Sequence, residues 1–257
     1  MGDLGASAGC GLAVAASLLA GAVAAATLRL PARLAALLTA FGGGTLLSAV
    51  ALELVPDADA RAGTALTAAG LVAGTLAYVG ADAWLTRNSA LRAHRRAAHA
   101  AAAGQPMPPQ PPGGRAEAVR GELVATGMVI DGIPESVALG LTVAEGNLGV
   151  GLLAGVLIAN LIEAYGAAQP MVAAGRTKGF VVRLIAGIAV TLMAFTVLGG
   201  TVLAGAAPDP IGTAQAVAAG AVLAAVSIEI VPHAFAEVSR LTAAATVAGF
   251  VAGYLLS

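Results

Sequence analysis

Charged residues are scarce in this chain of 257 residues: they make up 11 %, whereas 58 % of the residues are apolar. A soluble globular domain carries about 25 % charged residues, so the composition excludes that class. The net charge is −1 and basic residues gather in one loop only, which excludes a nucleic-acid-binding protein. The single cysteine, Cys10, excludes an internal disulfide framework and a cysteine-based zinc site. Aromatic residues, at 4 %, are too few for a stacking platform.

What the chain does contain is long apolar runs rich in alanine and glycine. The mean hydropathy is +0.89, and small residues of this kind let membrane helices pack closely. Eight runs approach the roughly 20 residues that a spanning helix needs. They cover residues 8–28, 34–55, 64–85, 123–143, 148–170, 181–204, 213–233 and 240–256. Because the runs are continuous rather than alternating, they predict an all-α polytopic membrane protein with a single transmembrane domain of eight helices.

The basic residues are distributed very unevenly between the predicted loops. All 13 lysines and arginines except Arg61 lie in loops that follow an odd-numbered span. Cytoplasmic loops carry such an excess, so we expect these loops in the cytoplasm, both termini outside, and the plasma membrane as the location. The longest loop, residues 86–120, is polar and proline-rich, and it is predicted to be a flexible cytoplasmic loop.

Two segments of the chain repeat each other. Residues 44–58 and 220–234 align without a gap, are identical at eight of 15 positions, and share a Glu-x-x-Pro ending. The predicted topology runs the two segments in opposite directions. It therefore predicts a 3+2+3 inverted repeat, an arrangement typical of transporters that bind substrate near the bilayer midplane. The alternative is a pair of similar helix ends with proline caps.

Acidic residues lie at the centre of two neighbouring predicted spans. Asp131 and Glu135 are four residues apart, and Asn160 and Glu163 are three apart, so each pair shares a helix face. Like charges in a low dielectric need a cation or protons among them. Carboxylate and amide oxygens suit hard or borderline divalent ions, so these four residues are the predicted metal site. Alternatively, each acid hydrogen-bonds a neighbouring helix and does nothing else.

Further ionisable residues lie near the ends of the second and seventh spans. Glu53 lies near the end of the first of these spans and Asp57 follows it, whereas Glu229 and His233 lie at the end of the second. We expect them to be outer and inner points on a cation pathway, with plain helix capping as the alternative.

The layout of these motifs resembles the ZIP (Zrt/Irt-like) metal transporters over nearly the whole chain. That family has eight spans, both ends outside and a long third loop. In span four it has His-Asn-x-Pro-Glu-Gly, where this chain keeps Pro134-Glu135; in span five Asn160 and Glu163 match its amide and glutamate. Asp131 and Ala159 stand where the family has histidines, and residues 187–200 lack a glutamate often found there.

The resemblance implies a transporter that imports a divalent metal of the zinc, iron or manganese class into the cytoplasm by alternating access. The metal is then the transported substrate, no prosthetic group is expected, and a homodimer is suggested by the family alone. Without histidines the site favours harder ions than zinc. The alternative is a divergent homologue that senses metal or acts as a scaffold without transporting it. An enzyme is not expected, because only His233 lies outside the 86–120 loop and a metallohydrolase usually needs several histidines.

Overall fold

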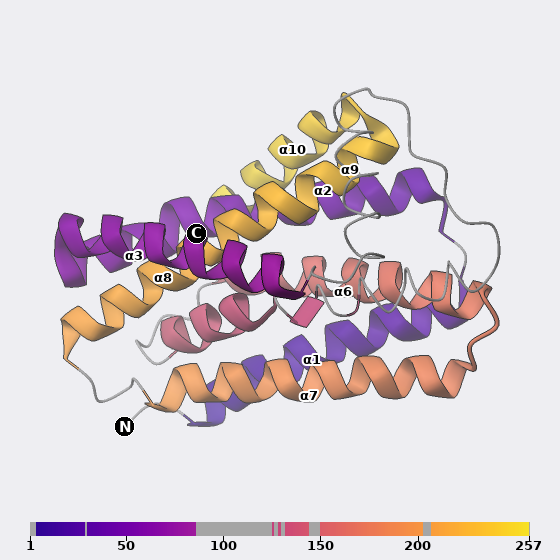
Figure 1. The fold of residues 1–257 in the computed structure, drawn as a ribbon, viewed down its shortest axis with the longest axis horizontal. Helices are drawn as coiled ribbons and strands as arrows, with labels where there is room; N and C mark the ends of the chain where they lie inside the picture. The colour runs from indigo at the N-terminus through magenta and orange to yellow at the C-terminus, as the bar shows by residue number, and fades with distance from the viewer. Residues whose placement is uncertain are drawn as a thin grey trace.

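The computed structural model describes residues 4–28, 30–85, 125, 128–129, 132–143, 150–202 and 207–256, and these form a bundle of long helices (Figure 1). The α-helices are α1 (Leu4–Thr27), α2 (Ala32–Ala49), α3 (Val55–Leu85), an unlabelled helix over Gly132–Val143, α6 (Val150–Ala173), α7 (Lys178–Val202), α8 (Pro208–Ala225), α9 (Val231–Val238) and α10 (Leu241–Leu256). Two π-helical segments, η1 (Val50–Leu54) and η2 (Val226–Ile230), join α2 to α3 and α8 to α9. No strand occurs in these ranges, so the all-α prediction is confirmed.

Each of the eight predicted runs coincides with a helix where the structure describes it. Within the described ranges, five helices are long and apolar enough to cross a membrane, and one of them, Arg33–Trp84, covers two predicted runs. The helices Gly132–Val143 and Leu241–Leu256 are apolar but shorter. These helices indicate a membrane protein, whereas the number of crossings stays a prediction. The predicted loop 86–120 lies outside the described residues.

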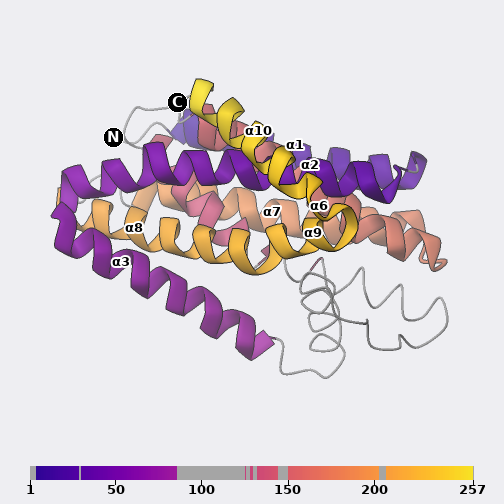
Figure 2. The ribbon, with the colours of Figure 1, turned by 90° about the horizontal axis from the view of Figure 1, so that it is seen from above.

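The long helices lie side by side in both views of the ribbon (Figures 1 and 2). α1 contacts α6 and α7, α2 contacts α6 and α10, and α3 contacts α8. Their shared core contains leucines from five helices: Leu18, Leu46, Leu139, Leu152 and Leu192. Other large apolar side chains, such as Leu12, Leu76 and Val190, are exposed on the outside. An apolar exterior is what a lipid environment requires.

Glycines bring α3 and α8 into backbone contact. A Cβ on Gly74 would overlap the carbonyl oxygen of Val217, and a Cβ on Gly220 would overlap that of Leu71. The Thr75 hydroxyl donates a hydrogen bond of 3.1 Å to the Gly220 carbonyl oxygen across the same crossing. Only residues without a side chain allow helices to approach this closely.

The crossing of α2 and α10 uses the same device. A Cβ on Gly44 would overlap the Thr246 carbonyl oxygen, and a Cβ on Gly249 would overlap that of Phe41. Gly44 occupies the position in the first matched segment that Gly220 has in the second. Phe41 precedes Gly44 by the same number of residues as Val217 precedes Gly220. The two crossings therefore correspond residue by residue on α2 and α8.

The two π-helical segments also occupy equal positions in the matched segments 44–58 and 220–234. η1 has the sequence Val-Ala-Leu-Glu-Leu and η2 has Val-Ser-Ile-Glu-Ile. Proline is the second residue of the helix that follows each segment, at Pro56 and Pro232. A proline lacks the N–H for the helical ladder and its ring presses on the preceding turn, which widens that turn. π-helical turns are rare and are frequent at functional sites.

α3 is broken at Gly63, and this break separates two of the predicted spans. Gly63 has φ 76° and ψ 161°, a combination that is essentially restricted to glycine. We expect Gly63→Ala to destabilise the protein by about 1–3 kcal/mol, because alanine is strained in this conformation. The measurement is thermal unfolding in detergent. Gly80→Ala is the control, since Gly80 lies in the same helix with no atom within 4 Å of an added Cβ; an equal loss in both variants would contradict the prediction.

Candidate functional site

The helix over Gly132–Val143 buries one of the predicted site carboxylates. It packs against α7 through Gly132, which faces Leu192, and Gly140, which faces the backbone at Thr196. Glu135 is only 2 % exposed and belongs to the largest fully buried side chains. A carboxylate held in an apolar helix costs about 2.5–3.5 kcal/mol on insertion scales. Its burial is therefore a feature that the fold maintains against a free-energy cost.

α6 positions the second pair of predicted site residues. It contacts α2 through Gly155 and Ala159, and it contacts α1 where Gly21 lies against Leu161. Helical periodicity places Asn160 and Glu163 together on the face between these two contacts. Asn160 is buried and Glu163 is half-buried, and both lie at the middle of a helix of 24 residues.

The amide of Asn160 is the clearest unsatisfied group at this depth. Asn160 is 1 % exposed, and neither its Oδ1 nor its Nδ2 has a hydrogen-bond partner within the described part of the chain. A buried polar group left without a partner costs about 1–3 kcal/mol. An oxygen donor in this situation fits a site that binds a cation, because the ion would supply the missing interaction.

The complete predicted site is only partly described. Asp131 lies outside the described residues, so the structure places Glu135, Asn160 and Glu163 but not the fourth member. Within the described ranges, no group of three or more His, Cys, Asp or Glu side chains is arranged to hold a metal ion. The predicted set has only two such acids in those ranges, Glu135 and Glu163. The four-residue site therefore stays a prediction.

Glu53 lies in η1, and its carboxylate faces the first turn of α6. It is 8 % exposed and approaches the backbone N–H groups of Gly151 and Leu152, although neither oxygen reaches hydrogen-bonding geometry. These N–H groups have no partner within α6, and a helix N-terminus favours a negative charge. A Cβ on residue 151 would overlap the present position of the Glu53 Oε1 atom, so a larger residue there would require the Glu53 side chain to move.

The other predicted pathway residues are placed less completely. Asp57 lies one turn after Glu53, in the first turn of α3, and is half-buried. Glu229 lies in η2 and His233 in α9, and their side chains are outside what the structure describes. The structure thus places Glu53 and Asp57 close together along the chain and leaves the proposed inner pair to prediction.

Gln215 is fully buried in α8 and was not predicted as a site residue. Neither its Oε1 nor its Nε2 has a hydrogen-bond partner in the described part of the chain. The signal that would have identified it is a polar amide early in the apolar run 213–233. Like Asn160, it is an unsatisfied amide within an apolar helix.

Tyr165 fixes α6 to the connection between α1 and α2. Its hydroxyl accepts a hydrogen bond of 2.6 Å from the Leu30 N–H and donates one of 3.4 Å to the Leu28 carbonyl oxygen. The connection would otherwise leave these backbone groups without a partner at a helix end. Tyr165 thus fixes one end of the helix that carries Asn160 and Glu163.

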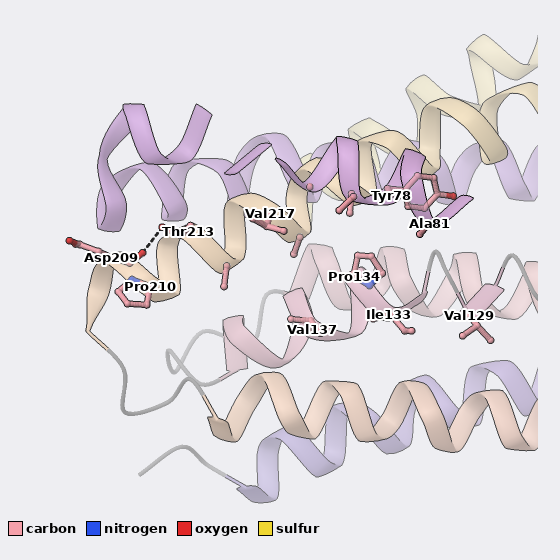
Figure 3. A pocket seen from close by; sticks show the side chains of 15 residues that line it. Tyr78, Ala81, Val129, Ile133, Pro134, Val137, Asp209, Pro210, Thr213 and Val217 are labelled. Atoms are coloured by element: carbon pink, nitrogen blue, oxygen red, sulfur yellow. Dashed lines mark hydrogen bonds between the residues drawn. The ribbon is translucent and has the colours of Figure 1, made fainter. Parts of the chain in front are cut away.

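An apolar groove separates Val129 and the helix Gly132–Val143 from α3 and α8 (Figure 3). Its volume is about 920 Å³. Ile133, Pro134 and Val137 form one wall, whereas Glu135 lies on the other side of the same helix, because two residues rotate the helix by roughly 200°. The groove and the predicted metal site therefore lie on opposite faces of this helix.

No protein-family model matches this chain, and no curated protein is significantly similar to it. A functional assignment therefore has to be argued from the residues and the fold of this chain. The resemblance to the ZIP transporters rests on the motifs around Pro134-Glu135 and Asn160 and on the order of the predicted spans.

Proposed function

We propose that this chain is a divalent-cation transporter that imports a metal of the zinc, iron or manganese class into the cytoplasm. The observation that carries the proposal is the presence of two buried oxygen donors in apolar helices, the Glu135 carboxylate and the unpartnered Asn160 amide. Ionisable groups within membrane helices are costly and usually mark ion pathways. Glu163, on the same face as Asn160, adds a second carboxylate.

The proposed ligands are Asp131, Glu135, Asn160 and Glu163. A cation arriving from water would exchange part of its hydration shell for these oxygens and offset the repulsion between the acids. An oxygen-only ligand set favours manganese, iron(II) or magnesium over zinc, which prefers nitrogen and sulfur donors. The metal is the transported substrate and no covalent bond is broken, so no enzymatic activity and no prosthetic group are proposed.

We propose that transport occurs by alternating access, because the chain contains two matched segments that we interpret as parts of an inverted repeat. We propose a 3+2+3 inverted repeat with both termini outside the plasma membrane, following the distribution of basic residues. The matched positions of η1 and η2 and the corresponding glycine contacts of Gly44 and Gly220 support it. In transporters built this way, the site lies where the two repeats meet.

The two proposed repeats differ at one place. α6 packs directly on α2, with Gly155 against Thr45 and Gly42 against Ala159. In the proposed repeat, the helix Gly132–Val143 corresponds to α6, and α8 corresponds to α2. The contact between the helix Gly132–Val143 and α8 should therefore match that between α6 and α2, yet the groove separates these two helices. The proposed repeats therefore pack closely at one of these places and are separated at the other.

The proposed pathway has an outer and an inner part. Glu53 and Asp57 would attract the cation at one end, and Glu229 and His233 would receive it at the other. The burial of Glu53 against the start of α6 supports this role, because that helix continues to Asn160.

A non-transporting homologue is the second candidate, as a metal sensor or scaffold. Ala159 stands where the resembled family has a metal-binding histidine, and the described residues hold no cluster of three ligands. A site with fewer ligands binds metal more weakly. A homodimer is proposed for either candidate from the resemblance only.

The test is metal uptake by purified protein in liposomes loaded with a metal-sensitive dye. We expect saturable uptake of at least one of Mn²⁺, Fe²⁺ and Zn²⁺ above protein-free liposomes. Uptake should fall as the external solution is acidified, because protons compete with the metal for carboxylates. If no metal enters while the same metal raises the melting temperature of the protein, the transporter is rejected in favour of the non-transporting homologue.

A further inference from the structure

The groove beside α8 has walls made almost entirely of apolar residues. Fifteen residues line it, including Tyr78 and Ala81 from α3, Ile133 and Val137 from the opposite wall, and Val217 from α8 (Figure 3). Asp209 is the one charged residue of this lining, and it lies at one end. The groove is therefore an elongated apolar surface with a single acidic end.

The length of the groove matches one leaflet of a bilayer. Its lining on α8 runs from Asp209 to Ala221, which corresponds to about 18 Å at 1.5 Å per residue. The hydrocarbon core of a bilayer is about 30 Å thick, so one leaflet accounts for about 15 Å. In the proposed topology α8 enters the membrane near its first residue, Pro208, so the groove would extend from the level of the headgroups to the middle of the membrane.

Water is a poor occupant of this groove. A buried water needs about two to four polar partners. The Thr213 hydroxyl already donates a hydrogen bond of 2.8 Å to the Asp209 carbonyl oxygen, and most other lining residues offer only carbon. An apolar recess at bilayer depth is filled by what surrounds it, which is lipid hydrocarbon.

We propose that this groove binds one acyl chain of a phospholipid with a primary-amine headgroup, of the phosphatidylethanolamine class, and that the amine lies over Asp209. The Asp209 carboxylate is exposed and points beyond the end of the groove, away from its apolar walls (Figure 3). A carboxylate at headgroup level attracts an ammonium group and repels the net negative charge of phosphatidylglycerol. The acyl chain supplies the affinity and Asp209 supplies the headgroup preference.

The only tryptophan of the chain provides the probe. Trp84 lies on α3 three residues after the groove residue Ala81, near the end remote from Asp209. Phosphatidylethanolamine brominated at the end of its acyl chains is added to the metal-free protein in detergent micelles. Binding in the groove predicts quenching of Trp84 that saturates at a low lipid mole fraction. Random contact predicts quenching that rises in proportion to lipid.

Groove-filling variants test the location. Ala214→Phe should raise the half-saturating lipid fraction by about tenfold or more, because loss of even two buried methylene groups has that effect on affinity. Val137→Phe, from the opposite wall, should do the same and replaces Ala214→Phe if that variant does not fold. Ala73→Phe is the matched control, since Ala73 is exposed on α3 and does not line the groove.

Four outcomes would overturn the proposal. Proportional quenching, or equal saturation in Ala214→Phe and Ala73→Phe, would show contact with bulk lipid only. Equal affinity for brominated phosphatidylethanolamine and phosphatidylglycerol would reject the headgroup assignment, as would a headgroup preference that survives in Asp209→Asn. Because no metal is present and Glu135 faces the other side of its helix, these results are independent of the transport proposal.

Discussion

Replacing Glu135 by glutamine is expected to lower metal uptake in reconstituted liposomes by more than about 100-fold. Glutamine keeps the shape of the buried side chain but removes the negative charge that compensates the cation. Loss of a partner that merely orients a metal ligand already costs about 10–100-fold in affinity, so loss of a ligand should exceed that. Initial uptake rates and calorimetric binding of the same metal provide the measurement.

Glu163→Gln should have a comparable effect, because its carboxylate shares a helix face with the Asn160 amide. Asp59→Asn is the matched control: it removes one negative charge from an exposed position of α3 and should leave uptake within about twofold. A melting temperature and elution volume near those of the unchanged protein show that the variants fold. Undiminished uptake in both glutamine variants would reject the proposed metal site.

The helices could be predicted because their signal is local. A run of about 20 apolar residues specifies a membrane helix without reference to any other part of the chain. Glu135 and Asn160 lie near the centres of two such runs, and the structure buries both side chains. Helix ends are less well determined: α8 begins at Pro208, five residues before the predicted run, since proline starts a helix readily.

What could not be predicted depends on how the helices pack. The matched segments were visible in the sequence, but the π-helical turns η1 and η2 require a backbone adjustment to Pro56 and Pro232 that periodicity does not show. The groove depends on the separation of the helix Gly132–Val143 from α8, which no local pattern encodes. Gly74 and Gly249 look like ordinary glycines in a glycine-rich chain, and only their contacts distinguish them from Gly80.

Gly74→Leu is expected to lower the melting temperature by about 6–12 °C in detergent, or to prevent accumulation of folded protein. A Cβ on residue 74 would overlap a backbone oxygen, Val217 O, which cannot turn away as a side chain does. Overpacking costs about 1–3 kcal/mol where side chains can move, so the upper value applies here. Each kcal/mol shifts the midpoint of a chain of this size by about 2–4 °C.

Glycine-to-leucine substitutions at two other positions show whether the loss of stability comes from close helix packing or from leucine in general. Gly80→Leu lies in the same helix, with open space around an added Cβ, and should change the midpoint by less than about 2 °C. Gly249→Leu should reproduce the loss, because Gly249 meets the Phe41 carbonyl oxygen as Gly74 meets that of Val217. Equal midpoints for Gly74→Leu and Gly80→Leu would contradict the close crossing of α3 and α8. A loss in Gly74→Leu without one in Gly249→Leu would remove the support that the glycine crossings give to the proposed repeat, since related crossings should share their steric limit.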